Sequence, residues 1–438
     1  MADPEPFPLL NTGTELEVDP NESRRRRKSS GLGGEIRAGD TGAPAFASSR
    51  ASLSASDANG HLGTGANGKE ANGKRISKRR RARGFLSRIR HTLVKRTWVL
   101  PAVLLAIFLS AYAVNPTESN ILHHFIFLSY PIPQTDPSVP VHYGKGKWDI
   151  AFVVFYMIVL SFTREFIMQE LLRPLARRTG LGKGKQARFM EQAYTAIYFG
   201  VLGPAGMYVM SRTPVWYFNT RGMYENFPHK THEATVKFYY LFQAAYWAQQ
   251  AVVLVLGLEK PRKDYYELVG HHIVSLALIG LSYRFHFTYI GIAVYTTHDI
   301  SDFFLASSKV LNYLDHPLIG PYFFVFLCVW VYLRHVINLK IIWSMFTEFR
   351  TVGPFELNWE TQQYKCWISQ YITTALLASL QALNLFWLFY IVRIALRFLT
   401  NQTATDDRSD DEEEEDSQQE QDVPTVTVNG KKANGKAD

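Results

Sequence analysis

The chain has very little cysteine. Cys328 and Cys366 are the only two among its 438 residues. Two cysteines so far apart give neither a disulfide framework nor the short ligand spacing of a zinc site. The sequence also lacks a long apolar run before residue 98, so we expect no secretory signal peptide. A disulfide-stabilised secreted domain is therefore excluded, and membrane insertion is expected to begin with the first long apolar run.

Large apolar residues are scarce at both ends of the chain. Residues 1–92 are rich in Gly, Ser, Asn and Arg, and residues 400–438 are acidic and polar. Such segments bury too little apolar surface to offset the entropy lost on ordering. We therefore expect a disordered basic tail over 1–92 and a disordered acidic tail over 400–438. Ser409 and Ser417 precede acidic residues, a pattern that acidophilic kinases phosphorylate, although a plain solvated tail explains it equally well.

Charged residues are rare in the long apolar runs between these tails. Crossing a bilayer takes about 20 apolar residues, and the run "WVLPAVLLAIFLSAYAV" is near the short end of that range. Eight such runs together would leave little surface able to face water if they were helices of a globular protein. The expected fold is an all-α polytopic membrane protein with about eight transmembrane helices. The expected spans are 98–114, 148–167, 191–210, 235–258, 267–285, 289–311, 318–340 and 366–395.

The positions of Lys and Arg predict the orientation of these spans. The basic stretches 75–96, 172–188 and 259–267 all fall on one side of the membrane if the spans alternate. Short basic loops stay in the cytosol, so both termini are expected to be cytosolic. The run "RRRRK" at 24–28 then indicates contact with anionic membrane lipids rather than with a nucleic acid.

Three cationic or titratable residues do not fit this pattern, because they fall toward the lumenal end of the seventh span. Either they face the protein interior or the boundary of that span is misplaced. They are Arg334, His335 and Lys340.

Four ionisable residues lie inside apolar runs, where each is costly to keep. His271 and His272 are adjacent in one span, and Asp299 and Asp302 lie on one helical face of the next span. We expect them to meet in a cavity open to the cytosol. The residues alone leave four roles open: a metal site, a proton relay, acid–base or nucleophilic catalysts, and satisfied core groups. Adjacent histidines cannot easily bind one ion, which counts against a metal.

The segment "HHIVSLALIGLSYRFHFTYIGIAVYTTHDISDFFLASSKVLNYL" (271–314) resembles the signature of the ceramide synthases, the longevity-assurance family of TLC-domain proteins, in its fungal form. The similarity extends through 246–250, 263–272 and 332–350, and it covers about 190–395. The resemblance implies a TLC-type catalytic membrane domain over 148–399, preceded by a first transmembrane helix at 98–114. It also implies a multi-pass protein of the endoplasmic reticulum membrane.

The resemblance further implies N-acylation of a sphingoid long-chain base, with acyl-CoA as co-substrate and no tightly bound cofactor or metal. The matched family residues are His271, His272, Asp299 and Asp302; His298 has no assigned role. Amide formation from a thioester requires removal of a proton from the amine, attack on the carbonyl and stabilisation of an oxyanion. His271 or His272 is expected to act as base or nucleophile, with the two carboxylates orienting the imidazole.

The resemblance also implies partners and an entrance for the co-substrate. Arg262 and Lys263 are expected to bind the acyl-CoA phosphates at a cytosolic mouth, although topology signalling alone explains them equally well. A small single-span regulatory subunit and a homo- or heterodimer are further expectations. The competing interpretation is a non-enzymatic TLC-domain protein that assists a translocon or handles lipid. Such proteins lack the paired His and Asp residues.

Overall fold

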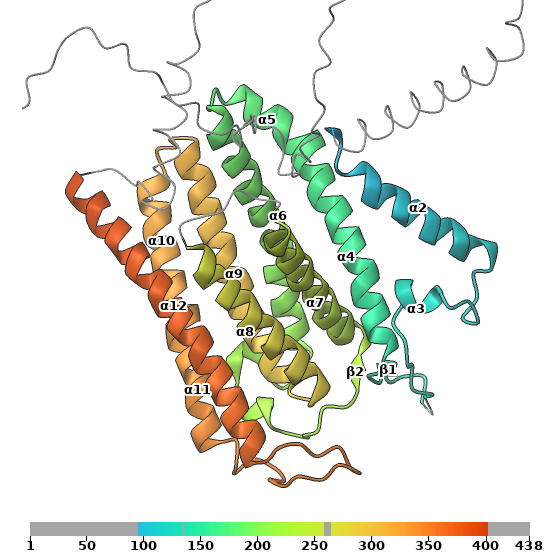
Figure 1. Ribbon diagram of the computed structural model, residues 1–438. Helices are drawn as coiled ribbons and strands as arrows, with labels where there is room; N and C mark the ends of the chain where they lie inside the picture. Colours follow the sequence, from blue (N-terminus) through green and yellow to red (C-terminus); the bar gives the residue numbers. More distant parts are fainter. Residues whose placement is uncertain (1–94, 135, 258–263, 402–438) are drawn as a thin grey trace, which may run out of the picture. The chain divides into compact units, whose positions relative to one another are not determined.

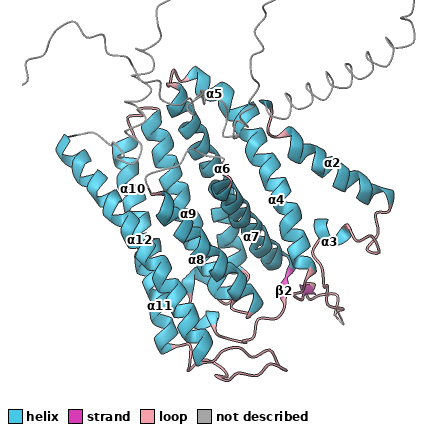
Figure 2. Cartoon of the chain, viewed as in Figure 1, coloured by secondary structure: helices cyan, strands magenta, loops and turns pink. Residues whose placement is uncertain are grey.

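The computed structural model describes residues 95–134, 136–257 and 264–401, and most of these residues are helical (Figures 1 and 2). They all belong to one compact unit of the chain. The two expected tails, apart from the first two residues of the acidic one, lie outside the described residues. Arg262, Lys263, Ser409 and Ser417 also lie outside them.

Each of the eight expected spans overlaps a helix, although the seventh, 318–340, continues beyond α10 into two further elements. The helices are α2 (Val99–Val114), α4 (Trp148–Phe166), α6 (Lys183–Ser211), α7 (Ala234–Val255), α8 (Tyr265–Arg284), α9 (Thr288–Tyr313), α10 (Ile319–Val331) and α12 (Trp367–Asn401).

Shorter elements extend or connect these helices. Two long rods contain a π-helical turn: α4 continues through η1 into α5, and α10 continues through η4 into α11. A two-stranded antiparallel ladder joins β1 to β2. The bounds are α3 (His123–Ile126), β1 (His142–Tyr143), η1 (Ile167–Leu172), α5 (Arg173–Arg178), η2 (Trp216–Phe218), η3 (Arg221–Met223), β2 (His232–Glu233), η4 (Tyr332–Ile337) and α11 (Asn338–Thr347).

Three of the rods are long and apolar enough to cross a membrane. They are Trp148–Arg178, Ile319–Thr347 and Trp367–Thr400, and α2 is a shorter apolar helix. The all-helical membrane character is thereby supported, whereas the count of eight spans is not confirmed. Helices α6 to α9 pack against one another in the interior and carry buried polar groups, which lowers their mean hydropathy.

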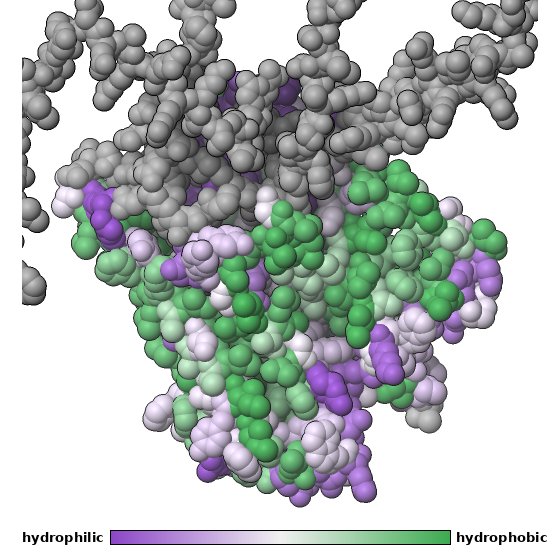
Figure 3. All heavy atoms as spheres, viewed as in Figure 1, coloured by the Kyte–Doolittle hydropathy of each residue, from purple (hydrophilic) through white to green (hydrophobic). Residues whose placement is uncertain are grey.

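Apolar side chains cover much of the visible face of the bundle (Figure 3). Ile107 of α2, Phe324 of α10 and Phe389 of α12 are each more than half exposed. Exposed apolar surface of this extent is typical of a protein whose outside faces lipid.

The helices run alternately in opposite directions, so that each end of the bundle gathers loops from distant parts of the sequence (Figure 1). One end holds α5 and the starts of α6, α8 and α10. The other holds β1, β2 and the starts of α7, α9 and α12. Within the bundle, α6 packs along α9, α4 along α7 and α12 along α8.

A close approach between α6 and α7 positions one phenol of the interior. A Cβ atom at Gly206 would lie 2.5 Å from the hydroxyl oxygen of Tyr239 and 3.0 Å from the side-chain oxygen of Thr296. Only a glycine leaves room for this contact. The Tyr239 hydroxyl is thus placed beside α9, where it meets a carboxylate described below.

The end of the bundle near β1 contains a buried polar cluster. Lys237 of α7 pairs with Asp149 of α4 at 2.7 Å and donates to the carbonyl oxygens of Ser129 and Gly144 at 2.8 and 2.7 Å. Lys145 donates to the carbonyl oxygen of Tyr283 at 3.2 Å. Burial lowers the pKa of Lys145 from 10.5 to about 7. This end is therefore fixed by the buried pair of Lys237 and Asp149, with the partly buried Lys145 beside it.

Candidate active site

A cavity of about 220 Å³ lies between α7, α8, α9 and α12, and residues of the loop from 348 to 366 form part of its wall. Its lining is mainly aliphatic and aromatic. Both His271 and Phe285 line it, which means that it extends about 20 Å along α8 at 1.5 Å per residue. An elongated apolar cavity of this kind suits a hydrocarbon chain.

The two adjacent histidines of α8 have different environments. His271 lines the cavity, is 5% exposed, and has a buried Nδ1 atom without a hydrogen-bond partner. Its ring lies edge-on between Trp247 and Trp387, with centroid distances of 5.5 and 5.2 Å. His272 instead donates from Nδ1 to the carbonyl oxygen of Leu268 at 2.8 Å, one turn earlier in the same helix. One imidazole of the pair therefore faces the cavity.

The two carboxylates of α9 are bound to other groups. Asp299 is fully buried, and its Oδ2 atom accepts hydrogen bonds from the Tyr239 hydroxyl at 2.9 Å and from the Gln243 amide. Asp302 accepts from the Arg334 guanidinium at 2.5 Å. Both side chains leave one helical face, as the spacing predicts, but they bind different neighbours.

These contacts correct one expectation about the site. The hydrogen bonds of Asp299 and Asp302 go to a phenol, an amide and a guanidinium rather than to an imidazole of α8. Among the described residues that line the cavity, His271 is present and the two carboxylates are not. Their bond partners come from α7 and η4, whose distance from α9 the sequence does not reveal. The carboxylates therefore hold helices together beside the cavity.

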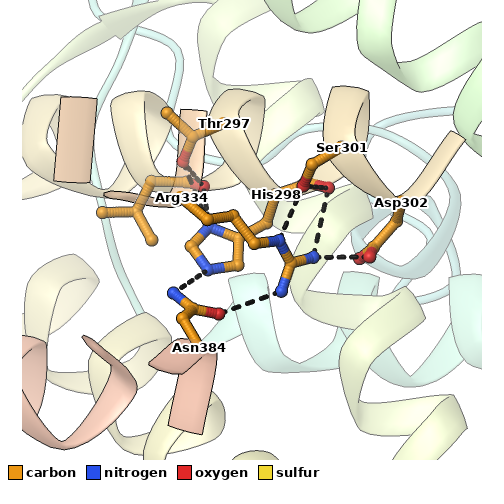
Figure 4. A network of polar contacts seen from close by, with 7 residues as sticks. Thr297, His298, Ser301, Asp302, Arg334 and Asn384 are labelled. Atoms are coloured by element: carbon orange, nitrogen blue, oxygen red, sulfur yellow. Dashed lines mark hydrogen bonds and ion pairs between the residues drawn. The ribbon is translucent and has the colours of Figure 1, made fainter. Parts of the chain in front are cut away.

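A polar network beside the cavity centres on Arg334, a residue of η4 that is 2% exposed (Figure 4). Arg334 donates from Nε to the Ser301 hydroxyl at 2.6 Å and from Nη1 to the amide oxygen of Asn384 at 3.1 Å. With Asp302 as its third partner, the guanidinium is satisfied by three separate side chains. Such pairing is what a buried charge requires.

His298 belongs to the same network and also lines the cavity. Its Nδ1 atom donates to the carbonyl oxygen of Val294 at 2.8 Å, which leaves Nε2 as the hydrogen-bond acceptor. The amide nitrogen of Asn384 lies 3.4 Å from Nε2 (Figure 4). Because Asn384 presents its oxygen to Arg334, its nitrogen is turned toward His298. The network thus fixes one tautomer of His298.

The cationic residues that disagreed with the expected topology are explained by packing. Arg334 and His335 are buried in the protein interior, and Gln381 of α12 donates to His335 at 2.8 Å. Lys340 is exposed and donates to the carbonyl oxygen of Phe218 at 3.3 Å. The first of the two explanations offered by the sequence therefore holds for Arg334 and His335.

Comparisons with known proteins agree with the helical architecture and the motif. Residues 188–393 match the model of the TLC domain family. The sphingosine N-acyltransferase-like protein FUM17 of Gibberella moniliformis is 54% identical over 341 residues, which cover 77% of this chain and 87% of that protein. Sphingosine N-acyltransferase lac1 of Schizosaccharomyces pombe is 48% identical, covering 76% and 87%. Ceramide synthase LAG1 of Saccharomyces cerevisiae is 49% identical, covering 72% and 76%.

The chain belongs to the TLC-domain family of sphingosine N-acyltransferases. In this family member, sequence reasoning missed His298, Arg334 and Asn384 as parts of the site. A signal for Arg334 did exist, because an arginine within an apolar run needs a buried anion and the carboxylates of α9 were available. Asn384 carried no such signal. Within the three described stretches, no group of three or more His, Cys, Asp or Glu residues is placed to hold a metal ion.

Proposed function

We propose that this chain is an acyl-CoA-dependent N-acyltransferase, which moves a fatty acyl group to the amine of a sphingoid base and forms a ceramide. The single observation that carries this proposal is the imidazole of His271 in the wall of a long apolar cavity. The relatives named sphingosine N-acyltransferase and ceramide synthase support it. A hydrocarbon chain would lie in the cavity with its reacting carbonyl next to this imidazole.

His271 is the proposed reacting group, and it has two routes to the amide. As a general base it takes a proton from the amine, which attacks the thioester carbonyl, and the coenzyme A thiolate leaves and takes a proton. As a nucleophile it first displaces the thiolate to form an acyl-imidazole, which the amine then cleaves to the amide while the imidazole is regenerated. Both routes balance without a further reactant.

The remaining site residues are proposed to act through their neighbours. Asp299 would fix Tyr239 and Gln243 against α9, and Asp302 would fix Arg334. His272 is held by its hydrogen bond to the carbonyl oxygen of Leu268. It would thereby help to fix the position of the histidine pair. These roles differ from the expected orientation of the imidazole by the carboxylates, because the hydrogen bonds of both carboxylates go elsewhere.

The membrane arrangement is also a proposal. Eight alternating spans would place α5 and the starts of α6, α8 and α10 on the cytosolic side of the endoplasmic reticulum, with both termini cytosolic. Arg262 and Lys263, next to the start of α8, would then meet the coenzyme A phosphates. Regulation by phosphorylation of Ser409 and Ser417 is proposed from the acidic residues that follow them. A single-span subunit and a dimer are proposed from the family resemblance alone.

Purified full-length protein tests the proposal directly. Incubation with labelled acyl-CoA and sphinganine should give labelled ceramide, and His271→Ala should reduce the rate at least about 1,000-fold while the protein still inserts and melts like the wild type. His335→Ala is the matched control, since that buried histidine lies outside the cavity lining. Acyl-CoA alone should label His271 if the nucleophilic route operates. Ceramide formation by His271→Ala at near the wild-type rate would rule the proposal out.

A further inference from the structure

The cavity contains a second imidazole at a different level from His271. Along α8, His271 lies about 20 Å from the end at Arg284, and along α9, His298 lies about 15 Å from the start at Thr288, at 1.5 Å per residue. These two ends are joined by a short turn. The two imidazoles therefore differ by about 5 Å along the bundle and contribute to one cavity wall.

His298 is built as a hydrogen-bond acceptor with an incompletely used lone pair. Its Nδ1 hydrogen is committed to Val294 at 2.8 Å, whereas the Asn384 amide reaches Nε2 only at the long distance of 3.4 Å. A ligand hydroxyl can take this lone pair at a shorter distance. The ring is held from Nδ1 by Val294, and Asn384, which Arg334 fixes, lies beside Nε2 (Figure 4). A ligand hydroxyl would therefore replace only the long contact to Asn384. The acceptor is thus preorganised, which lowers the cost of binding a polar group.

The chemistry of the two substrates decides which of them this acceptor suits. A saturated acyl chain has no polar atom beyond its carbonyl, so it cannot donate to a hydrogen-bond acceptor about 5 Å from the reacting imidazole. A sphingoid base has hydroxyls on the carbons next to its amine. With the amine at His271, a neighbouring hydroxyl comes within reach of His298.

We infer that His298, held by Asn384, is the subsite that accepts a hydrogen bond from a hydroxyl of the sphingoid head group and so selects amino alcohols over plain alkyl amines. The inference rests on the proposed N-acyltransferase function and names the group that recognises its acceptor substrate. A site that hydrogen-bonds a substrate hydroxyl rejects the analogue lacking it, because the buried polar group is then left unpaired.

The test compares sphinganine with octadecylamine, an amine of the same chain length without hydroxyls, using purified full-length protein and one acyl-CoA. The wild type should prefer sphinganine in kcat/KM. His298→Met should lower that preference about tenfold, the value of one hydrogen bond, through a higher KM for sphinganine. The KM for acyl-CoA and the efficiency with octadecylamine should stay within about twofold. His298→Gln, which retains an acceptor, should restore most of the preference.

His335→Met provides the matched control. His335 is also buried and bonded to an amide, that of Gln381, but it does not line the cavity. An unchanged preference in His298→Met, or an equal loss in His335→Met, overturns the inference. Should His298→Met fail to fold, the wild type is tested with 1-deoxysphinganine and with 3-deoxysphinganine. Efficiencies with both analogues equal to that with sphinganine also overturn the inference. If the wild type acylates no amine at all, the proposed function itself fails, and the two failures are thereby distinguished.

Discussion

The ion pair between the buried Arg334 and the partly buried Asp302 gives the sharpest prediction about what holds the site together. Replacing Arg334 by methionine removes the cation but keeps an unbranched chain of similar length. Asp302 then loses its partner at 2.5 Å, and Ser301 and Asn384 lose bonds of 2.6 and 3.1 Å. Breaking one side of a buried pair costs about 3–5 kcal/mol, because the remaining charge is uncompensated.

We expect Arg334→Met to lower the free energy of unfolding by about 4 kcal/mol, a fall of roughly 10 °C in Tm for a domain of this size. The double variant Arg334→Met with Asp302→Leu removes both charges, so it should recover at least about 2 kcal/mol of that loss. Thermal unfolding of the purified protein in one detergent, followed by tryptophan fluorescence, measures all three proteins.

Lys340→Met is the matched control for this series. It makes a comparable substitution on the same rod, at an exposed lysine with one backbone hydrogen bond, and should change stability by less than about 0.5 kcal/mol. A double variant no more stable than Arg334→Met would refute the reasoning, because the loss would then come from packing or from the other bonds rather than from an unpaired carboxylate.

Two further predictions concern the end of the bundle near β1 and β2. Burial lowers the pKa of Lys145 from 10.5 to about 7, so the folded state holds fewer protons than the unfolded state between these values and stability rises with pH across that window. Melting at pH 6 to 9 should therefore show a steeper rise for the wild type than for Lys145→Met, and equal slopes would contradict this. A Cβ at Gly222 would lie 2.1 Å from the carbonyl oxygen of Pro214, a backbone atom that cannot easily move. Gly222→Ala should lower the Tm by several degrees, whereas Gly182→Ala, where a Cβ meets nothing within 4 Å, should not.

The sequence predicted the helices well because their signal is local. Apolar runs of the right length lie on α2, α4 and α12 with boundaries close to those observed. The same criterion did not establish eight membrane spans. Helices such as α9 are interior helices whose polar residues face neighbouring helices. A criterion based on mean hydropathy counts those polar residues against a membrane span.

The motif predicted which residues share a helical face but not the contacts that they make. His271 and the i, i+3 pair of carboxylates were recognisable because their spacing along one helix fixes which face they share. The partner of Asp302 is 32 residues away on another rod, and that of Asp299 is 60 residues away on α7. No periodicity within one helix contains that information. The expected bond between carboxylate and imidazole was wrong for this reason.

By itself, the sequence determined that this chain is a helical membrane protein with ionisable groups in its interior. An ionisable residue that interrupts a long apolar run is expected to be buried, and the sequence alone reveals such positions. Only the tertiary structure decided that His271 and His298 face one cavity while Asp299 and Asp302 brace its wall. The physical reason is that helix geometry fixes the direction of each side chain from its own axis, whereas the partner that it meets depends on how separate helices cross and rotate against one another.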